Sequence, residues 1–153
     1  MVTRRYSQID YSQSSKTYNV IMAAPSAALV PYEPPLASAA LVLKAPTRSF
    51  ALKNGGALTI RQHYGAGGSK TGGAVWDASF VLADYVDRVC RQHWRPGSRT
   101  LELGAGLGLV SLAAARCNLG QVLATDGDAA VLPLLEDNVR LNGADNVTSV
   151  RLL

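Results

Sequence analysis

A glycine-rich turn between a short apolar strand and an alanine-rich helix is the feature that most constrains how this chain can fold. The same strand-and-helix alternation continues to the end of the sequence. The segments are, in order, the strand Thr100–Leu103, the turn Gly104–Gly108, the helix Leu109–Arg116, a strand at 121–125, a helix to about Leu141, and a strand at 147–153. Strands that alternate with helices predict a parallel sheet with right-handed crossovers. We therefore predict an α/β fold with a doubly wound parallel sheet.

The turn and the end of the second strand predict a site for a ligand that contains a nucleoside. Glycines let a ligand approach the backbone closely, and the N-terminus of the following helix presents unpaired N–H groups to it. Asp126 ends the second strand, the place from which a carboxylate accepts hydrogen bonds from ribose hydroxyls. The alternative for Asp126 is a helix-capping or loop carboxylate, and we expect Asp128 to be a surface or helix N-terminal charge.

The glycine spacing distinguishes between two kinds of nucleoside cofactor. A dinucleotide fingerprint requires its third glycine where this chain has Leu109. Here Glu102 precedes Gly104 by two positions, and Gly106 and Gly108 follow. This pattern resembles motif I of the class I, Rossmann-like methyltransferases, in which the loop passes beneath the methionine portion of S-adenosylmethionine. Because that portion carries an ammonium and a sulfonium, a carboxylate at Glu102 suits it better than it would suit a phosphate.

A second segment narrows this resemblance. Residues 71–83 read TGGAVWDASFVLA, which is similar to the segment before motif I in the seven-β-strand protein-lysine methyltransferases, the family that includes the valosin-containing-protein lysine methyltransferase. Further similar segments are Ile60-Arg61-Gln62, Thr125-Asp126, Pro133-Leu134-Leu135, and Asn138 with Asn142. The resemblance spans about residues 49–153 and covers only the N-terminal part of such a domain.

The resemblance implies a cofactor, a substrate class and a set of site residues. The cofactor is S-adenosylmethionine, and the substrate is a protein methylated on a lysine side chain. The implied cofactor-binding residues are Trp76, Glu102, Gly104, Gly106 and Asp126. Apart from the resemblance, Trp76 is equally well a core aromatic residue. Asn138 and Asn142 share a helix face, which we interpret as a packing and solvation feature; no catalytic residue is assigned and no metal is expected.

Three elements are predicted between the leader and the glycine turn. Residues 48–62 predict a β-hairpin, because Asn54-Gly55 supplies the positive φ of a tight turn. Residues 64–73 predict a flexible glycine-rich connector and not a phosphate-binding loop, which needs glycine at two places where this chain has Tyr64 and Ser69. Residues 77–94 predict one helix capped by Asp77. The expected apolar stripe of this helix is Ala78, Val81, Leu82, Tyr85, Val86, Val89, Cys90 and His93.

The composition indicates which cellular compartment and which classes of partner to expect. Residues 1–47 are rich in proline, alanine and serine and poor in acids, which predicts a leader of little order. We expect a cytoplasmic protein, since two cysteines without a pairing or metal-binding spacing fit a reducing compartment. The alternative is an organelle reached through an N-terminal transit segment. No apolar run is long enough to cross a bilayer, and no basic cluster interleaved with aromatics points to nucleic acid.

The sequence departs from the family pattern after the third strand. In the family, the first strand is paired with the second on one side and with a fourth on the other, and later parts admit the lysine. We therefore expect an open apolar edge at Leu101–Leu103 that can pair with another chain. The first hypothesis is a methyltransferase by lineage whose present chain is an inactive fragment. The alternatives are a non-catalytic cofactor-binding or interaction fragment and, more remotely, half of a nicotinamide-dependent oxidoreductase.

Overall fold

The computed structural model describes most of the chain from residue 43 onward. The described residues are 18–19, 31–32, 43–54, 56–65, 71–93, 95, 97–117 and 120–152. The chain divides into two compact units, Met1–Pro35 and Leu36–Leu153. In the first unit, β1 (Tyr18–Asn19) pairs antiparallel with β2 (Pro31–Tyr32). The rest of the predicted leader up to residue 42, and the middle of the glycine-rich connector at 66–70, lie outside the described residues.

A parallel sheet of three strands forms the C-terminal part of the second unit. Its order is β5 (Thr100–Leu103), β6 (Val122–Asp126) and β7 (Val147–Arg151). The register pairs Leu103 with Thr125 and Asp126 with Arg151. The glycine turn after β5 and Asp126 at the end of β6 therefore lie at the same edge of the sheet. The predicted α/β, Rossmann-like class is confirmed; helices on the second face, which a doubly wound sheet would have, are not among the described elements.

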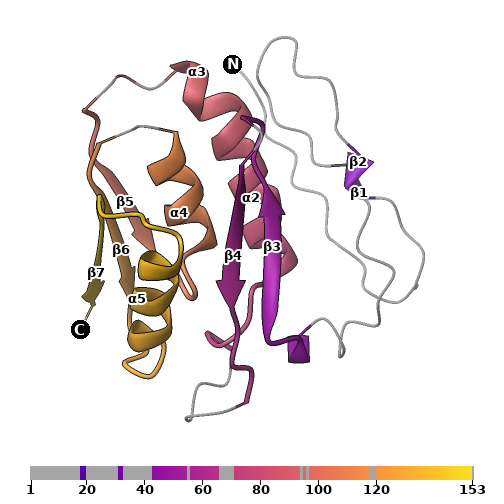
Figure 1. The fold of residues 1–153 in the computed structure, drawn as a ribbon, viewed down its shortest axis with the longest axis vertical. Coiled ribbons are helices and arrows are strands. Elements are labelled where there is room, and N and C mark those ends of the chain that lie inside the picture. The colour runs from indigo at the N-terminus through magenta and orange to yellow at the C-terminus, as the bar shows by residue number, and fades with distance from the viewer. Residues whose placement is uncertain are drawn as a thin grey trace, which may run out of the picture. The chain divides into compact units, whose positions relative to one another are not determined.

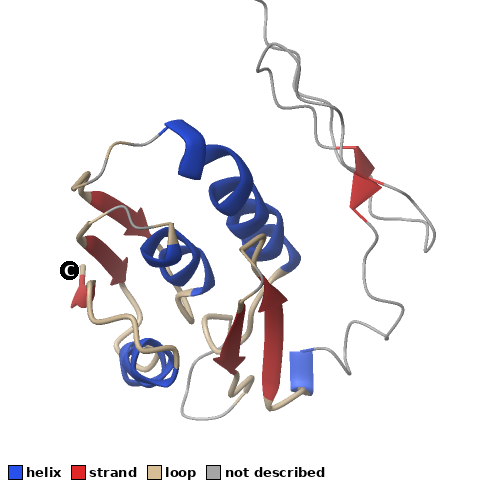
Figure 2. Ribbon diagram, turned by 45° about the horizontal axis from the view of Figure 1, so that its top comes forward, coloured by secondary structure: helices blue, strands red, loops and turns tan. Residues whose placement is uncertain are grey.

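The two crossover helices lie on one face of this sheet. They are α4 (Leu109–Arg116) and α5 (Leu132–Leu141), with Pro133 in the first turn of α5 as expected. The three strands lie in the sheet in the same order as in the sequence. Two right-handed crossovers in that direction place both helices on the same face of the sheet, as Figures 1 and 2 show. Large apolar side chains remain exposed on the strands and at the end of β7. They are Leu101, Leu103, Leu123, Val150 and Leu152.

The predicted hairpin is present and packs onto the crossover helices. It consists of β3 (Thr47–Ala51) and β4 (Ala57–Arg61), which pair antiparallel with Phe50 opposite Leu58. Alternation places Leu58 and Ile60 on one face of β4, where both are buried. Strand β4 contacts α4 and α5, so these helices lie between the hairpin and the sheet (Figure 2).

The helix before the sheet differs from its prediction in three ways. It is α2 (Asp77–Tyr85), continued by the π-helical segment η1 (Val86–Cys90) and by α3 (Arg91–His93). Asp77 is not the cap: Trp76 holds the N-cap position in extended backbone without a side-chain cap. Asp77 instead lies in the first turn, where the helix dipole stabilises a carboxylate. The expected apolar stripe is also wrong in part, because Ala78, Leu82 and His93 are exposed.

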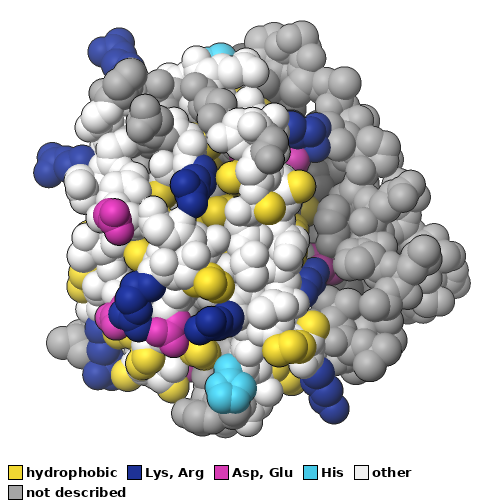
Figure 3. All heavy atoms as spheres, in the orientation of Figure 1, with side chains coloured by type: hydrophobic (Ala, Val, Ile, Leu, Met, Phe, Trp, Pro, Cys, Tyr) yellow, Lys and Arg dark blue, Asp and Glu magenta, His cyan; other side chains and the backbone are white. Residues whose placement is uncertain are grey.

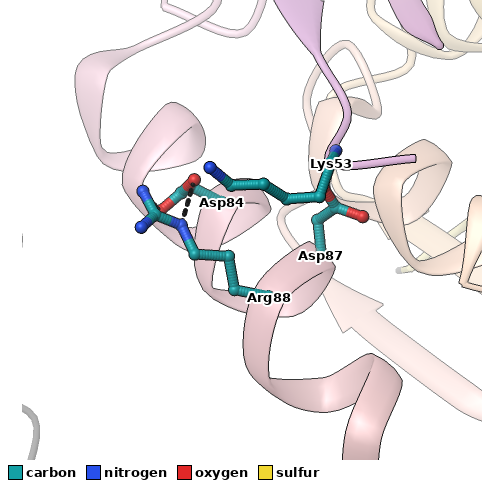
Figure 4. A network of polar contacts seen from close by, with 4 residues as sticks. All are labelled: Lys53, Asp84, Asp87 and Arg88. Atoms are coloured by element: carbon teal, nitrogen blue, oxygen red, sulfur yellow. Dashed lines mark hydrogen bonds and ion pairs between the residues drawn. The ribbon is translucent and has the colours of Figure 1, made fainter. Parts of the chain in front are cut away.

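A buried carboxylate accompanies the π-helical segment. Asp87 is 2% exposed, and its Oδ2 accepts a hydrogen bond from the backbone N–H of Lys53 at 2.6 Å. Figure 4 shows Asp87 beneath the hairpin turn, with Asp84 and Arg88 paired on the same helix. A π-helical turn changes the direction of the side chains that follow it. The buried residues of η1 are Val86 and Cys90, as the expected stripe has them, and Asp87, which it does not include.

One core joins the hairpin, the helices and the sheet. Its fully buried large apolar members are Leu58, Ile60, Leu109, Leu112, Val122, Val131 and Leu135. On the face seen in Figure 3, lysine and arginine side chains are spread over the surface, and at the lower left several lie beside acidic side chains. Within the described ranges, no helix combines the length and the apolar character needed to cross a bilayer.

Candidate functional site

A cavity lies at the edge of the sheet where β5 and β6 end. Its volume is about 230 Å³. One wall is the segment just before α2, the second is the glycine loop, and the third is the end of β6. The lining residues are Thr71, Gly72, Ala74, Val75, Trp76 and Ser79 on the first wall, Gly104 to Leu109 on the second, and Asp126 with Asp128 on the third.

The glycine loop needs glycine for two different reasons. Gly106 has φ of 53° and Gly108 has φ of 86°, in the left-handed region that other residues rarely adopt. At Gly108, an added Cβ would lie 2.3 Å from Leu135 Cδ1, so this glycine lets the start of α4 approach α5. At Gly106, the nearest atom to an added Cβ would be Gly72 O, at 3.7 Å. The glycine loop and the segment before α2 are therefore close neighbours at the cavity.

Asp126 ties the glycine loop to the end of β6. Its Oδ2 accepts a hydrogen bond from Gly106 N–H at 2.8 Å, and its Oδ1 accepts one from Asp128 N–H at 2.9 Å. The helix-cap alternative is not what the structure shows, because Asp128, and not Asp126, accepts a bond from Ala130 N–H in the turn before α5. Asp126 therefore combines a structural contact to the loop with a position in the cavity wall.

Glu102 lies behind the loop and is not among the residues that line the cavity. Its carboxylate accepts a hydrogen bond from the hydroxyl of Ser111, in the first turn of α4. Burial raises the pKa of Glu102 above its ordinary value; the hydrogen bonds from Ser111 oppose this shift, and the charge of Asp126 adds to it. The carboxylate thus faces the N-terminus of α4, where negative charge is stabilised by the helix dipole.

Trp76 lies on the surface of the cavity and not in the core. Its side chain is 45% exposed, and its Nε1 donates a hydrogen bond to Thr71 O at 2.9 Å. The two residues before it, Ala74 and Val75, are buried. The structure thus brings together four of the five residues implied by the resemblance. Those lining the cavity are Trp76, Gly104, Gly106 and Asp126.

Two asparagines on α5 have a role that the sequence interpretation missed. Both are buried, and each uses its side-chain amide to pair with one residue of β4. Asn138 pairs with the N–H and C=O of Arg61, and Asn142 pairs with those of Thr59. Four residues along a helix rise about 6 Å, close to the roughly 6.8 Å spanned by two residues of an antiparallel strand. The spacing of the asparagines matches that of alternate residues on β4. Their burial confirms the packing part of the interpretation, and the solvation part was wrong.

Comparisons with known proteins place this geometry in a family. The family described as lysine methyltransferase matches residues 52–153. Protein N-lysine methyltransferase METTL21A of Mus musculus is 36% identical over 115 residues, which cover 75% of this chain and 50% of that protein. Ribosomal protein L11 methyltransferase of Listeria innocua is 33% identical over 71 residues, covering 46% of this chain and 20% of that protein. The chain thus spans half or less of the length of these relatives.

Solved structures give a partial match. The N-terminal domain of EvdMO1, determined in the presence of SAH and D-fucose, is 31% identical with a TM-score of 0.41 and covers 46% of this chain and 30% of that one. The family match covers the hairpin turn, the cavity and the whole sheet. It confirms S-adenosylmethionine as the cofactor class expected for the family, and it leaves the nicotinamide-dependent alternative without support. The chain belongs to the lysine methyltransferase family.

Proposed function

We propose that this chain binds S-adenosylmethionine in the cavity between Trp76 and the glycine loop, as part of an enzyme that methylates lysine side chains of proteins. The observation that carries the proposal is the meeting of Trp76, Gly106 and Asp126 around one cavity. The acceptor class is supported by family membership and by the similarity to a protein N-lysine methyltransferase.

The carboxylate of Asp126 has capacity for a ribose. An ionised carboxylate offers about four lone-pair positions. Gly106 N–H and Asp128 N–H occupy two of them. The remaining two suit the pair of hydroxyls of a ribose, which is the role expected of an acidic residue at the end of the second strand.

The size of the cavity fits part of the cofactor. Cavities that enclose a whole small ligand measure roughly 300–1,000 Å³, whereas this one measures about 230 Å³. We infer that the described residues hold the ribose and the methionine portion. The positive φ angles of the loop glycines let the backbone approach the ligand without a side chain in between.

The chemistry explains what the residues must do. When bound, S-adenosylmethionine supplies an electrophilic methyl group, which an amine nitrogen attacks while the carbon–sulfur bond breaks and its electron pair remains on sulfur. The glycine loop and Asp126 would hold the donor in one orientation, and Trp76 would cover it against water. These are contributions of positioning and desolvation, so no general base is assigned.

We further propose that this chain by itself transfers no methyl group above background. Well-oriented reactants gain roughly 7–11 kcal/mol from positioning, and the cavity accounts for one reactant only. Supplying radiolabelled S-adenosylmethionine and a cell extract stripped of its own methyltransferases tests this. We expect equal label in protein with the wild type and with a Gly106→Arg variant, whose side chain would fill the cavity. Excess label with the wild type would show that the chain is active.

Calorimetric titration tests the binding proposal. We expect heat of binding with S-adenosylmethionine and with S-adenosylhomocysteine, and none with NAD. Trp76→Ala is expected to lower the affinity for both ligands, while Trp76→Phe, which keeps an aromatic face, retains most of it. Because Trp76 is 45% exposed and lies outside the core, neither variant should change the melting temperature much. Binding of NAD without binding of S-adenosylmethionine would overturn the proposal.

A further inference from the structure

Asn138 connects three elements at one buried point. It lies on α5 and is 0% exposed. Its Oδ1 accepts a hydrogen bond from Arg61 N–H at 2.8 Å, and its Nδ2 donates to Arg61 O at 3.2 Å. The same Nδ2 donates to Leu107 O in the glycine loop at 3.1 Å. One side chain therefore fixes the loop against the end of β4.

The strand that Asn138 holds continues directly to the opposite wall of the cavity. Gln62, the next residue after Arg61, accepts a hydrogen bond from Val75 N–H at 2.8 Å through its Oε1. His63 N–H donates to Gly73 O at 2.8 Å. An added Cβ at Gly73 would lie 2.7 Å from His63 O, so only glycine allows this close approach. The end of β4 thus sets the position of the segment that carries Trp76.

The contacts form one continuous path between the two walls. It runs from Leu107 O through the side chain of Asn138 to the backbone of Arg61, and from there through Gln62 to Val75 N–H. Both ends of the path line the cavity. Buried hydrogen bonds of this kind restrict motion, since breaking any of them leaves a polar group unpaired.

Asn142 provides a natural comparison. It is the C-cap residue of α5 and is buried, and it pairs with the N–H and C=O of Thr59 as Asn138 pairs with those of Arg61. Its remaining donor contact goes to Asn138 O within the helix and not to the glycine loop. The two asparagines therefore hold the same strand, and only one of them reaches the cofactor cavity.

We infer that Asn138 is a positioning residue of the cofactor site, which fixes the separation between the glycine loop and the Val75–Trp76 wall. The inference rests on the proposed function for the identity of the ligand. It predicts that cofactor binding and the hydrogen bonds between Asn138 and Arg61 are thermodynamically coupled, so that each stabilises the other. The hydrogen bonds between Asn142 and Thr59 should be coupled to cofactor binding much less.

Asn138→Asp and Asn142→Asp form a matched pair of variants. Each keeps the side-chain volume and the oxygen that accepts the strand N–H, and each loses the N–H donor. We expect both to lower the melting temperature. Asn138→Asp loses two donor contacts, to Arg61 O and to Leu107 O, and Asn142→Asp loses those to Thr59 O and Asn138 O. Only Asn138→Asp loses a hydrogen bond to the glycine loop, so only this variant should raise the Kd for S-adenosylhomocysteine, by about tenfold. Asn142→Asp should leave the Kd close to that of the wild type. Equal Kd changes in the two variants would overturn the inference.

Two further readouts cover the cases in which a variant does not fold or the wild type does not bind. Hydrogen exchange in the wild type should show slower exchange of Arg61 and Val75 N–H on adding S-adenosylhomocysteine, with Thr59 N–H unchanged; protection confined to the glycine loop would overturn the inference. In a Trp94→Phe background, Trp76 is the single tryptophan. Its emission in the ligand-free protein should shift with Asn138→Asp and not with Asn142→Asp. Absence of wild-type binding together with this shift would overturn the proposed function and leave the positioning role standing.

Discussion

Two strand edges in this molecule differ in whether their backbone N–H and C=O groups have partners. The edge of β4 that faces away from β3 is closed by Asn138 and Asn142, which pair with Arg61 and Thr59 from a helix. The edge of β5 that faces away from β6 has no partner strand among the described residues, and its Leu101 and Leu103 are 59% and 68% exposed. Both edges consist of backbone N–H and C=O groups that need partners. The edge of β4 is satisfied by side chains of the same chain, and the edge of β5 has no partner strand among the described residues.

The difference indicates in which part of the molecule the described residues satisfy the backbone groups themselves. The hairpin side combines buried apolar residues with satisfied backbone groups, so its structure depends on contacts that this chain supplies. The sheet side has one face covered by α4 and α5 and a row of exposed leucines on β5. Exposed strand edges of this kind favour association with another strand. The cofactor cavity lies where these two sides meet, and its stability depends on both.

Opening the closed edge should have the largest effect. Replacing both Asn138 and Asn142 by alanine leaves the N–H and C=O groups of Arg61 and Thr59 without partners. At roughly 1–3 kcal/mol for each buried unpaired group, we expect a loss of about 4 kcal/mol or more, a large part of a typical stability of about 5–15 kcal/mol. Urea unfolding would measure it. A loss below about 1 kcal/mol would show that water satisfies this edge.

Removing the carboxylate beneath the hairpin turn should have the next largest effect. Asp87→Ala deletes the acceptor of Lys53 N–H at a site that is 2% exposed, and we expect a loss of about 1–3 kcal/mol. The control is Asp84→Ala, which breaks an ion pair with Arg88 that is about one-third exposed (Figure 4) and should cost less than about 1 kcal/mol. Similar losses for the two variants, measured by thermal unfolding, would contradict the distinction.

A pH series tests the partly buried Glu102 on the sheet side. Burial raises its pKa in the folded chain, so the folded state binds the proton more readily than the unfolded state does. Stability therefore falls as pH rises from the ordinary pKa of glutamate to the raised value, and it stays lower above that range. The stability of Glu102→Gln relative to the wild type should therefore increase from acidic to neutral pH, and the hydrogen bonds from Ser111 keep this increase small. A stability difference that moves the other way with pH would contradict this sign.

Charge on the open edge should have the smallest effect on stability. Leu103→Lys replaces a side chain that is 68% exposed, and we expect a change within about 0.5 kcal/mol. Self-association, measured by sedimentation, should decrease, because a lysine on an edge strand opposes pairing with another strand. Leu123→Lys on β6, a strand that is paired on both sides, makes the same change away from an edge and serves as the control. If both variants associate alike, the β5 edge is not the site of pairing.

Local patterns predicted the parts of the fold that depend on neighbouring residues. The turn at Gly104–Gly108, the bounds of α4 and the position of Asp126 follow from glycine spacing and apolar periodicity within short windows. The same holds for the hairpin and for the end of α5 at Asn142. Each of these is set by φ preferences or by one buried face.

Contacts between distant residues account for what the sequence did not predict. Asn138 and Arg61 are 77 residues apart, and Asn142 and Thr59 are 83 apart. The burial of Asp87 follows from a partner 34 residues away. Glu102 was expected to face the ligand, and the Ser111 hydroxyl on α4 holds it instead. A polar residue on a helix face has the same local pattern whether it meets water or a strand edge, so only the tertiary arrangement separates the two.

The most direct test of the cofactor site compares two aspartates that line the same cavity. Asp126 holds Gly106 N–H and is proposed to hold the ribose, whereas Asp128 is exposed and accepts only a local turn contact from Ala130 N–H. Calorimetry with S-adenosylhomocysteine should show that Asp126→Ala weakens binding by about 1.5–3 kcal/mol, and that Asp128→Ala changes it by less than about 0.5 kcal/mol. Unchanged affinity in Asp126→Ala, with the wild type binding measurably, would contradict the account of this site.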